Sequence, residues 1–359
     1  MTVTRRAVVF GYHNVGVRCL RVLLDAGIEV ALVVTHEDSS SENIWFDSVA
    51  ALAQSEAIAV ITPSDPNSVE VIDRIKSIQP DFIFSFYYRS MLSESVLQLA
   101  RHGAFNLHGS LLPHYRGRAP VNWAVLKGER STGASLHYMV AKPDAGDLVA
   151  QTEVPILNND TAAEVFEKVT VAAELTLWRA LPAIVALQAP RSPLDLKSGS
   201  YFGGRKPADG EILWGSGAAA VHNLVRAVAP PYPGAWFDLR NHRFEVHETR
   251  QTSVPADFLL NGLTTGSLAP DNLATDGLTT DGFAPDMDSP TLYLDREQCL
   301  VIWPPQQAAA PRAMAGTLSA LRLRKIAHTG QPCSPARLRE LLSVTDAHAL
   351  IVLQEDHQI

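Results

Sequence analysis

The segment from residue 105 to residue 151 holds several side chains that could do acid–base chemistry. Asn106 and His108 lie two residues apart, so at the end of an extended strand both side chains point to the same side. Asp144 follows in a loop that contains proline and glycine, where no helix can run. If the fold brings this loop back over the strand end, the amide, the imidazole and the carboxylate form one polar site.

These three side chains suit the transfer of an acyl group. His108 can accept a proton from the attacking group, and Asp144 can hold and electrostatically support the imidazole. Asn106 can donate a hydrogen bond to a developing oxyanion. The segment has no Gly-x-Ser-x-Gly turn to carry a nucleophilic serine. We therefore expect the attacking group to come from the substrate, as in acyl transfer to an amine.

Two other interpretations use the same part of the chain. The three side chains could form a satisfied polar cluster at a strand end with no catalytic role. A metal site would instead use His108, His114, His137 and Asp144. No pair of these residues has i, i+4 spacing and no cysteine is nearby, which disfavours metal binding. We therefore predict that the protein uses no metal.

Two guanidinium groups lie close to His108 in the sequence. Arg116 and Arg118 flank a glycine in a loop that ends at Pro120, just before a predicted helix. Such a loop could be solvated surface. Two arginines this near a proposed base are better explained by the recognition of a carboxylate or a phosphate.

The turn Gly11-Tyr12-His13-Asn14-Val15-Gly16 joins a predicted strand to a predicted helix. A helix N-terminus attracts anions, so this turn could face a phosphate of a ligand. It has neither the G-x-G-x-x-G spacing of dinucleotide-binding proteins nor the Gly-Lys-Ser/Thr of a P-loop. A tight turn without a ligand is an equally good interpretation.

The first half of the chain alternates apolar strand-like runs with helical patterns. This alternation predicts an α/β fold with a mostly parallel sheet that is covered on both faces. Ligands bind beyond the carboxyl ends of the strands in such sheets, and Asn106 and His108 lie at one such end. The expected strands are residues 7–10, 30–34, 57–61, 82–86, 104–107, 133–139 and 148–154. The expected helices are residues 17–26, 45–53, 68–78, 121–127 and 161–187, the last kinked or broken near Pro182.

The character of the chain changes after residue 195, where we place the end of a catalytic domain over residues 1–195. The loop-forming residues 198–207 are interpreted as a linker. Residues 196–326 show short strands with turn signals, which predict a small barrel-like domain. Its expected helix is 218–228, and its expected strands are 235–239, 244–248, 292–294, 299–303 and 321–326. Residues 253–290, rich in Asp and without Lys or Arg, are interpreted as an insertion with no apolar face to bury, and residues 327–359 as a tail with a helix at 335–342.

Composition restricts the partners and the compartment. The formal net charge of −8 and the pI of about 5.8 disfavour a polyanion such as nucleic acid as the main partner. The three cysteines have no metal-ligand spacing, so a reduced, cytoplasmic chain is the simplest interpretation. No apolar run is long enough for a membrane span, so no membrane association is predicted.

A resemblance to a known family rests on four stretches of sequence. The run FNLHGSLLPHYRGRAPVNW (105–123), with the later loop AKPDAGDLVAQ (141–151), resembles the signature of the 10-formyltetrahydrofolate-dependent formyltransferases. The runs FSFYYRSML (84–92) and FGGRKPADGEILW (202–214) are most similar to the formyltransferase domain that modifies UDP-4-amino-4-deoxy-L-arabinose, a reaction of lipid A modification. The resemblance covers about residues 5–250.

This resemblance implies a Rossmann-like catalytic domain followed by a smaller barrel-like (OB-like) domain. It also implies that 10-formyltetrahydrofolate donates the formyl group and that a small-molecule nucleotide amino sugar accepts it. Asn106, His108 and Asp144 match the catalytic trio of the family. The donor is then expected to contact Ser90, Met91, Leu92, Arg118, Val140, Ala141, Lys142, Pro143 and Asp144, and the acceptor Tyr12, His13, Asn14, Arg116, Asn122 and Trp123.

Two alternatives to a nucleotide sugar enzyme remain open. The acceptor could be another amine, such as methionyl-tRNA or a hydroxyornithine-type siderophore precursor, although a tRNA reader should carry a basic face. The protein could also bind folate without turnover. Simple binding has no physical need for Asn106, His108 and Asp144 together, which disfavours this second alternative. The sequence does not predict an oligomeric state.

Overall fold

The computed structural model describes residues 5–39, 43–252, 254, 289–294, 296–303, 319–344 and 349–353. They form two compact units, which are described separately. The first contains the residues up to Arg205, and the second contains the residues from Lys206 together with Leu126–Gly128. The insertion expected at residues 253–290 lies outside the described residues except for residues 254, 289 and 290. None of the described helices is long and apolar enough to cross a membrane.

The first unit is built on a seven-stranded sheet with the order β3-β2-β1-β4-β5-β7-β8. The first five of these strands run parallel, whereas β7 and β8 are antiparallel to their neighbours. All of β4 is buried, as expected for a strand that is covered on both faces. The predicted Rossmann-like, mostly parallel sheet is therefore confirmed. The strands are β1 Arg6–Gly11, β2 Glu29–Val34, β3 Val60–Ile61, β4 Phe82–Phe86, β5 Gly103–His108, β7 Ser131–Tyr138 and β8 Leu148–Pro155.

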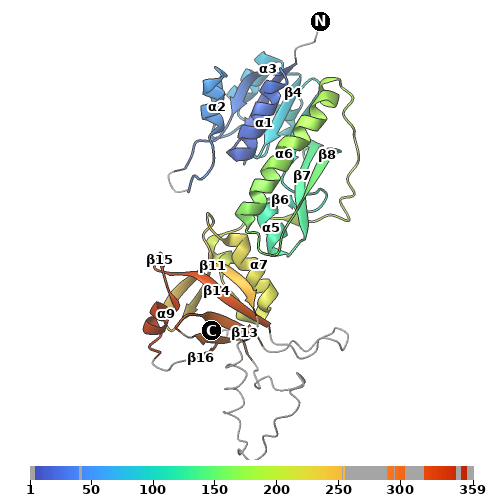
Figure 1. Cartoon of the computed structure of the whole chain (residues 1–359). Helices are drawn as coiled ribbons and strands as arrows, with labels where there is room; N and C mark the ends of the chain where they lie inside the picture. Colours follow the sequence, from blue (N-terminus) through green and yellow to red (C-terminus); the bar gives the residue numbers. More distant parts are fainter. Residues whose placement is uncertain are drawn as a thin grey trace, which may run out of the picture. The chain divides into compact units, whose positions relative to one another are not determined.

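Helices cover both faces of this sheet (Figure 1). Apolar residues of α3 and α4 pack with Val8, Phe10 and Ile83 in one core cluster. Helices α1 and α6 pack against each other, and α6 lies along β7 and β8. The carboxyl end of β5, where the polar site is expected, thus belongs to a sheet that lies between two layers of helices. The helices are α1 His13–Asp25, α2 Val49–Ser55, α3 Val69–Ile78, α4 Glu94–Leu97, α5 Pro120–Leu126 and α6 Ala162–Val185.

Side-chain caps explain where several helices begin. The hydroxyl of Ser68 accepts a hydrogen bond from an amide in the first turn of α3. Thr161 and Glu164 form a reciprocal capping box at the start of α6. Contrary to one expectation, α6 is not broken at Pro182 but continues through it to Val185.

The segment expected to be a linker contributes to the first unit. β9 (Tyr201–Phe202) pairs in parallel with β6 (Arg116–Gly117), which lies in the arginine loop. The Phe202 ring stacks on the rings of Tyr115 at 5.2 Å and Trp123 at 4.8 Å between centroids. These contacts attach residues 201–202 to the loop that follows the proposed base.

The second unit is a curled antiparallel half-barrel with the strand order β10-β11-β14-β13-β12-β16, and β15 pairs with β14. This confirms the predicted barrel-like fold. Its elements are η1 Pro207–Gly210, η2 Trp214–Ser216, α7 Ala218–Val228, β10 Ala235–Leu239, β11 His242–Thr252, β12 Thr291–Leu294, β13 Cys299–Trp303, β14 Ser319–His328, β15 Gln331–Pro332, α9 Pro335–Leu341 and β16 Ala349–Val352.

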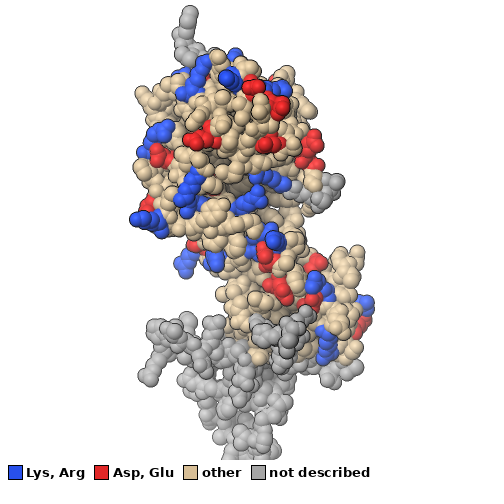
Figure 2. All heavy atoms as spheres, turned by 180° about the vertical axis from the view of Figure 1, so that it is seen from behind, with Lys and Arg blue, Asp and Glu red and all other residues tan. Residues whose placement is uncertain are grey.

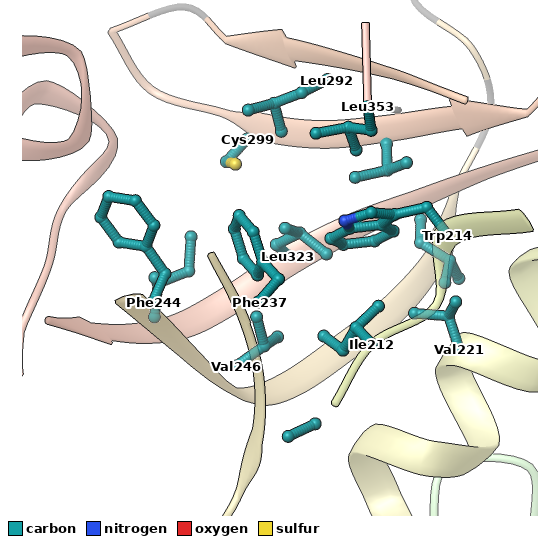
Figure 3. Packing of buried hydrophobic residues seen from close by; sticks show 14 of the residues in the cluster. Ile212, Trp214, Val221, Phe237, Phe244, Val246, Leu292, Cys299, Leu323 and Leu353 are labelled. Atoms are coloured by element: carbon teal, nitrogen blue, oxygen red, sulfur yellow. The ribbon is translucent and has the colours of Figure 1, made fainter. Parts of the chain in front are cut away.

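A large apolar core cluster joins the strands and helices of the second unit (Figure 3). Trp214 packs among residues from the strands, and its carbonyl accepts a 2.7 Å hydrogen bond from the Trp303 indole. Residues beyond 327, which were expected to be a tail, add α9 and β16 and bury Leu338 and Leu353 in the same core. The described part of this region is therefore integral to the half-barrel.

Candidate active site

The proposed catalytic residues lie at the carboxyl end of β5. This strand pairs with β4 in parallel on one side and with β7 antiparallel on the other. The register places Asn106 directly opposite His137 of β7. Because side chains alternate along a strand, Asn106 and His108 share one face of the sheet.

The loop after β7 brings Asp144 back over this strand end, as the sequence predicts. The Asp144 Oδ1 atom lies 3.5 Å from His108 Nδ1 and 3.6 Å from His137 Nε2. The Asn106 amide nitrogen donates to Asp144 Oδ1 at 3.4 Å and lies 3.1 Å from His137 Nε2. The structure thus brings Asn106, His108 and Asp144 together, with His137 as a fourth member.

Asp144 is held by its backbone as well as by its partners. Its φ of 48° lies in the left-handed region, which aspartate tolerates better than most residues. The backbone N–H of Gly117 donates to Asp144 Oδ2 at 2.9 Å. Burial opposes ionisation of this carboxyl, but the charge of the His108 ring and the hydrogen bonds from His137 and Gly117 outweigh it. The pKa of Asp144 is therefore well below its usual range.

Both ring nitrogens of His108 face acceptors. Nε2 lies 2.8 Å from the Tyr115 carbonyl oxygen, which can only accept, so Nε2 carries a hydrogen. Nδ1 lies at ion-pair distance from the Asp144 carboxylate. An imidazole between a carbonyl and a carboxylate is suited to carry positive charge. This arrangement favours a ring that stabilises negative charge or donates a proton, and a role as base requires proton exchange at one of these two nitrogens.

Sequence reasoning missed the position of His137, which it considered only as a metal ligand. His137 Nδ1 donates to the carbonyl of its neighbour Tyr138 at 2.8 Å, and its Nε2 lies 3.1 Å from the Asn106 amide nitrogen and 3.6 Å from Asp144 Oδ1. The pairing of β5 with β7 could have predicted this contact, but the antiparallel register is not written in the sequence. His114, the other histidine considered as a metal ligand, is exposed. Across the described residues, no group of three or more His, Cys, Asp or Glu is arranged to hold a metal ion.

Asp144 should make the stability of the protein sensitive to acid. Its stabilising contribution is fully present above the unfolded-state pKa of about 3.9 and is lost as the pH falls through the lower folded-state pKa. Below about pH 5, the free energy of unfolding of the wild type should therefore fall more steeply than that of Asp144→Asn. Urea unfolding at several pH values measures this difference, with Asp73→Asn on the exposed face of α3 as control. Parallel curves for wild type and Asp144→Asn would contradict the ion-pair assignment.

The residues expected to hold the folate donor lie on two loops that meet in one core cluster. Leu92 is buried in this cluster, and Met139 packs against it from the other loop. Beside these anchors the Met91 and Val140 side chains are 55% and 45% exposed. The segments Ser90–Leu92 and Val140–Asp144 therefore present apolar side chains to solvent at one edge of the site.

The turn at the end of β1 reaches the proposed base through aromatic contacts. The His13 ring stacks on Phe46 at 3.9 Å and makes an edge contact with Phe166 at 4.7 Å. Phe166 in turn contacts Tyr87. A Cβ built on Gly109, the residue after His108, would lie 1.9 Å from the Tyr87 hydroxyl, so a side chain there would require Tyr87 to move.

The other two residues of the turn make polar contacts. The Tyr12 hydroxyl donates to Asp38 Oδ1 at 2.8 Å, and the Asn14 side chain accepts from the Asp47 amide at 2.8 Å. These bonds fix the turn at the carboxyl end of β1, two strands away from β5.

The remaining candidate residues lie on β6, on α5 and in the short segment between them. Asn122 is buried, whereas Arg118 is exposed and its backbone amide donates to the Phe202 carbonyl at 3.0 Å. The Trp123 indole donates to Gly203 O at 2.9 Å. Segment 201–203 therefore shapes the surroundings of these residues, a contribution that the sequence did not reveal.

The sequence matches two models of one protein family. Residues 5–181 match the formyl transferase domain, and residues 205–257 match the formyl transferase C-terminal domain. Together the two matches cover more than half of the chain. The chain belongs to the formyl transferase family, and the protein is therefore a formyltransferase.

Solved structures share the fold at low sequence identity. An N-formyltransferase from Helicobacter canadensis, in complex with folinic acid and dTDP-3-aminofucose, is 16% identical with a TM-score of 0.60 over 89% of this chain and 99% of its own. The sugar 3-N-formyltransferase WlaRD, with dTDP and 5-N-formyl-tetrahydrofolate, is 17% identical with a TM-score of 0.60 over 89% and 97%. HypX from Aquifex aeolicus, in complex with tetrahydrofolic acid, is 14% identical with a TM-score of 0.54 over 93% and 47%.

Proposed function

We propose that the protein transfers the formyl group of 10-formyltetrahydrofolate to the amino group of a nucleotide-linked amino sugar, with UDP-4-amino-4-deoxy-L-arabinose as its acceptor. The observation that carries this proposal is the grouping of Asn106, His108 and Asp144 at the carboxyl end of β5. The Arg-Gly-Arg-Ala-Pro-Val-Asn-Trp run and the complexes of the similar sugar formyltransferases support the acceptor class.

In this proposal the acceptor amine attacks the formyl carbon of the donor, and the carbonyl oxygen becomes an oxyanion. Asn106, which is partly exposed, donates a hydrogen bond to this oxyanion, and the His108 ring adds positive charge. Asp144 keeps the ring in place and compensates its charge. The bond between the formyl carbon and N10 then breaks. The amine loses one proton and N10 gains one, so tetrahydrofolate leaves without a covalent enzyme intermediate.

We assign the donor to the edge formed by Ser90–Leu92, Val140–Asp144 and Arg118. Exposed Met91 and Val140 side chains suit the flat apolar faces of a folate. The acceptor is assigned to Tyr12, His13 and Asn14 at the N-terminus of α1, and to Arg116, Asn122 and Trp123 around β6 and α5.

Charge disfavours methionyl-tRNA as the acceptor. The net charge of the chain is −8, and acidic and basic side chains are interspersed on the face shown in Figure 2. A tRNA reader needs a clustered basic surface. We also propose a reducing, cytoplasmic location, because all three cysteines are buried free thiols.

An acceptor panel tests the function directly. The protein is incubated with 10-formyltetrahydrofolate and UDP- and dTDP-linked amino sugars, methionyl-tRNA or hydroxyornithine, and mass spectrometry identifies the molecule that gains a formyl group. We expect a nucleotide amino sugar to gain it. Formylation of only tRNA or hydroxyornithine would overturn the acceptor assignment. Tight folate binding without any product would favour a binding protein.

A further inference from the structure

Arg116 is a buried arginine for which the described residues supply no counter-charge. The residue is only 8% exposed, and its Nε atom is buried without a hydrogen-bond partner. No side-chain hydrogen bond or ion pair joins it to any other described residue, and its Cζ lies 5.9 Å from the centroid of the Tyr201 ring. Arginine stays charged under all ordinary conditions, so this charge cannot be relieved by loss of a proton.

Such an arrangement is costly in a protein without a ligand. Removal of an unpaired ion from water is costly, and a cation–π contact with one ring offsets only part of that cost. Buried charges in proteins are therefore paired or bind a charged ligand. The other arginines of comparable burial, Arg226 and Arg339, do make hydrogen bonds, to Asn223 and to the Leu294 carbonyl.

The backbone holds Arg116 next to the proposed catalytic group. Its amide donates to Ser200 O at 3.0 Å, and the next residue, Gly117, donates to the Asp144 carboxylate. Gly117 has a φ of 97°, and a Cβ there would lie 2.2 Å from the Phe202 carbonyl, so the close pairing of β6 with β9 requires glycine. Arg116 thus directly precedes the residue whose backbone amide binds the Asp144 carboxylate.

Tyr201 gives this position an aromatic wall. Its side chain is 57% exposed although it extends from the short strand β9, which fixes its backbone. The rings of Tyr115 and Trp123 both stack on Phe202, the next residue of β9, and Arg205 lies over Trp123. A buried cation beside an exposed, fixed ring is suited to a ligand that combines an oxyanion with a flat or apolar group.

We propose that Arg116 binds a phosphate of the acceptor's diphosphate and that Tyr201 covers the adjoining part of the nucleotide. This inference rests on the proposed function and adds the contact that selects a nucleotide-linked sugar over a free amino sugar. The planar guanidinium can bind two phosphate oxygens at once, which a point charge cannot do. A carboxylate of the folate donor could bind the guanidinium in the same way. The experiment therefore compares ligands that carry the acceptor phosphate with ligands that carry the donor carboxylate.

Ligand-induced thermal shifts test this site without turnover. The melting temperature of the full chain is measured alone and with UDP, uridine or folinic acid, for the wild type, Arg116→Met, Arg116→Lys and the control Arg74→Met, whose guanidinium is exposed on α3. We expect UDP to stabilise the wild type and the control. In Arg116→Met the affinity for UDP should fall about 10- to 100-fold, and Arg116→Lys should recover part of it. Uridine should bind the wild type and Arg116→Met with the same affinity, and so should folinic acid.

Several results would overturn the site. An unchanged UDP shift in Arg116→Met would show that the guanidinium does not bind phosphate. If Arg116→Met loses only the thermal shift caused by folinic acid, the guanidinium binds the donor. Because the unpaired charge is costly, Arg116→Met without ligand should melt at or above the wild-type temperature, and a large decrease would show a structural role. A UDP shift that depends on Arg116, in a protein that formylates no amino sugar, would retain the site and reject the proposed function.

Discussion

Replacement of His108 by alanine is expected to lower kcat by about 10²-fold or more while the fold is retained. The ring lies between the Tyr115 carbonyl and the Asp144 carboxylate, and in the proposed mechanism it brings a proton and positive charge to the reacting atoms. Its removal leaves Asp144 without its main compensating charge. The loss should therefore exceed that from removal of a proton carrier alone.

The measurement separates chemistry from binding. Initial rates with varied donor and acceptor give kcat and both KM values, and the loss is expected in kcat. His102→Ala is a matched control, because His102 lies at the opposite, amino-terminal end of β5, where its Nε2 lies 3.5 Å from Asp81. A near-normal kcat for His108→Ala would overturn the catalytic assignment. A fall in melting temperature large enough to unfold the variant would require His108→Gln as a second test.

The parts of the fold that were predicted well are those with uninterrupted local patterns. The strand at 82–86, the helix at 218–228 and the strands at 235–239 and 299–303 have the expected bounds. Each is an apolar or amphipathic run whose own composition favours one structure. The parallel sheet followed from their alternation with helices.

Elements whose bounds depend on distant contacts were predicted less well. The helix expected at 45–53 begins only at Val49, because the rings of Trp45 and Phe46 pack on His13 and Phe166 instead of continuing a helix. The two residues of β9 carry no periodicity of their own. They become a strand because they pair with β6, so a local interpretation sees only a linker.

In the candidate site too, local patterns were predictable and distant contacts were not. The spacing of Asn106 and His108 and the proline- and glycine-containing loop at Asp144 predicted that these three side chains could meet if the loop folds back over the strand end. The family resemblance pointed to the same three residues. The partners that restrict His108 were not predictable, since one is a backbone carbonyl at Tyr115 and another, His137, depends on strand register. The absence of a counter-charge beside Arg116 among the described residues depends on packing. The sequence around Arg116 indicates only that this side chain could bind an anion.

The second large effect is expected for Asn106→Ala, which should lower kcat by about 10²- to 10³-fold, or about 2.7 to 4 kcal/mol, with little change in either KM. A donor that is aimed at charge formed in the transition state contributes little to substrate binding. An effect confined to KM would contradict this role.

The contacts of Asn106 allow a second explanation that must be tested in parallel. Its amide also bonds His137 and Asp144, so Asn106→Ala could act by releasing these residues. His137→Gln removes the first contact and leaves the Asn106 amide in place. If Asn106 stabilises the oxyanion, His137→Gln should be far milder than Asn106→Ala, and Asn106→Ala should still cause most of its loss in the His137→Gln background. Equal losses in both single variants, with no further loss in the double variant, would show that Asn106 only positions its neighbours.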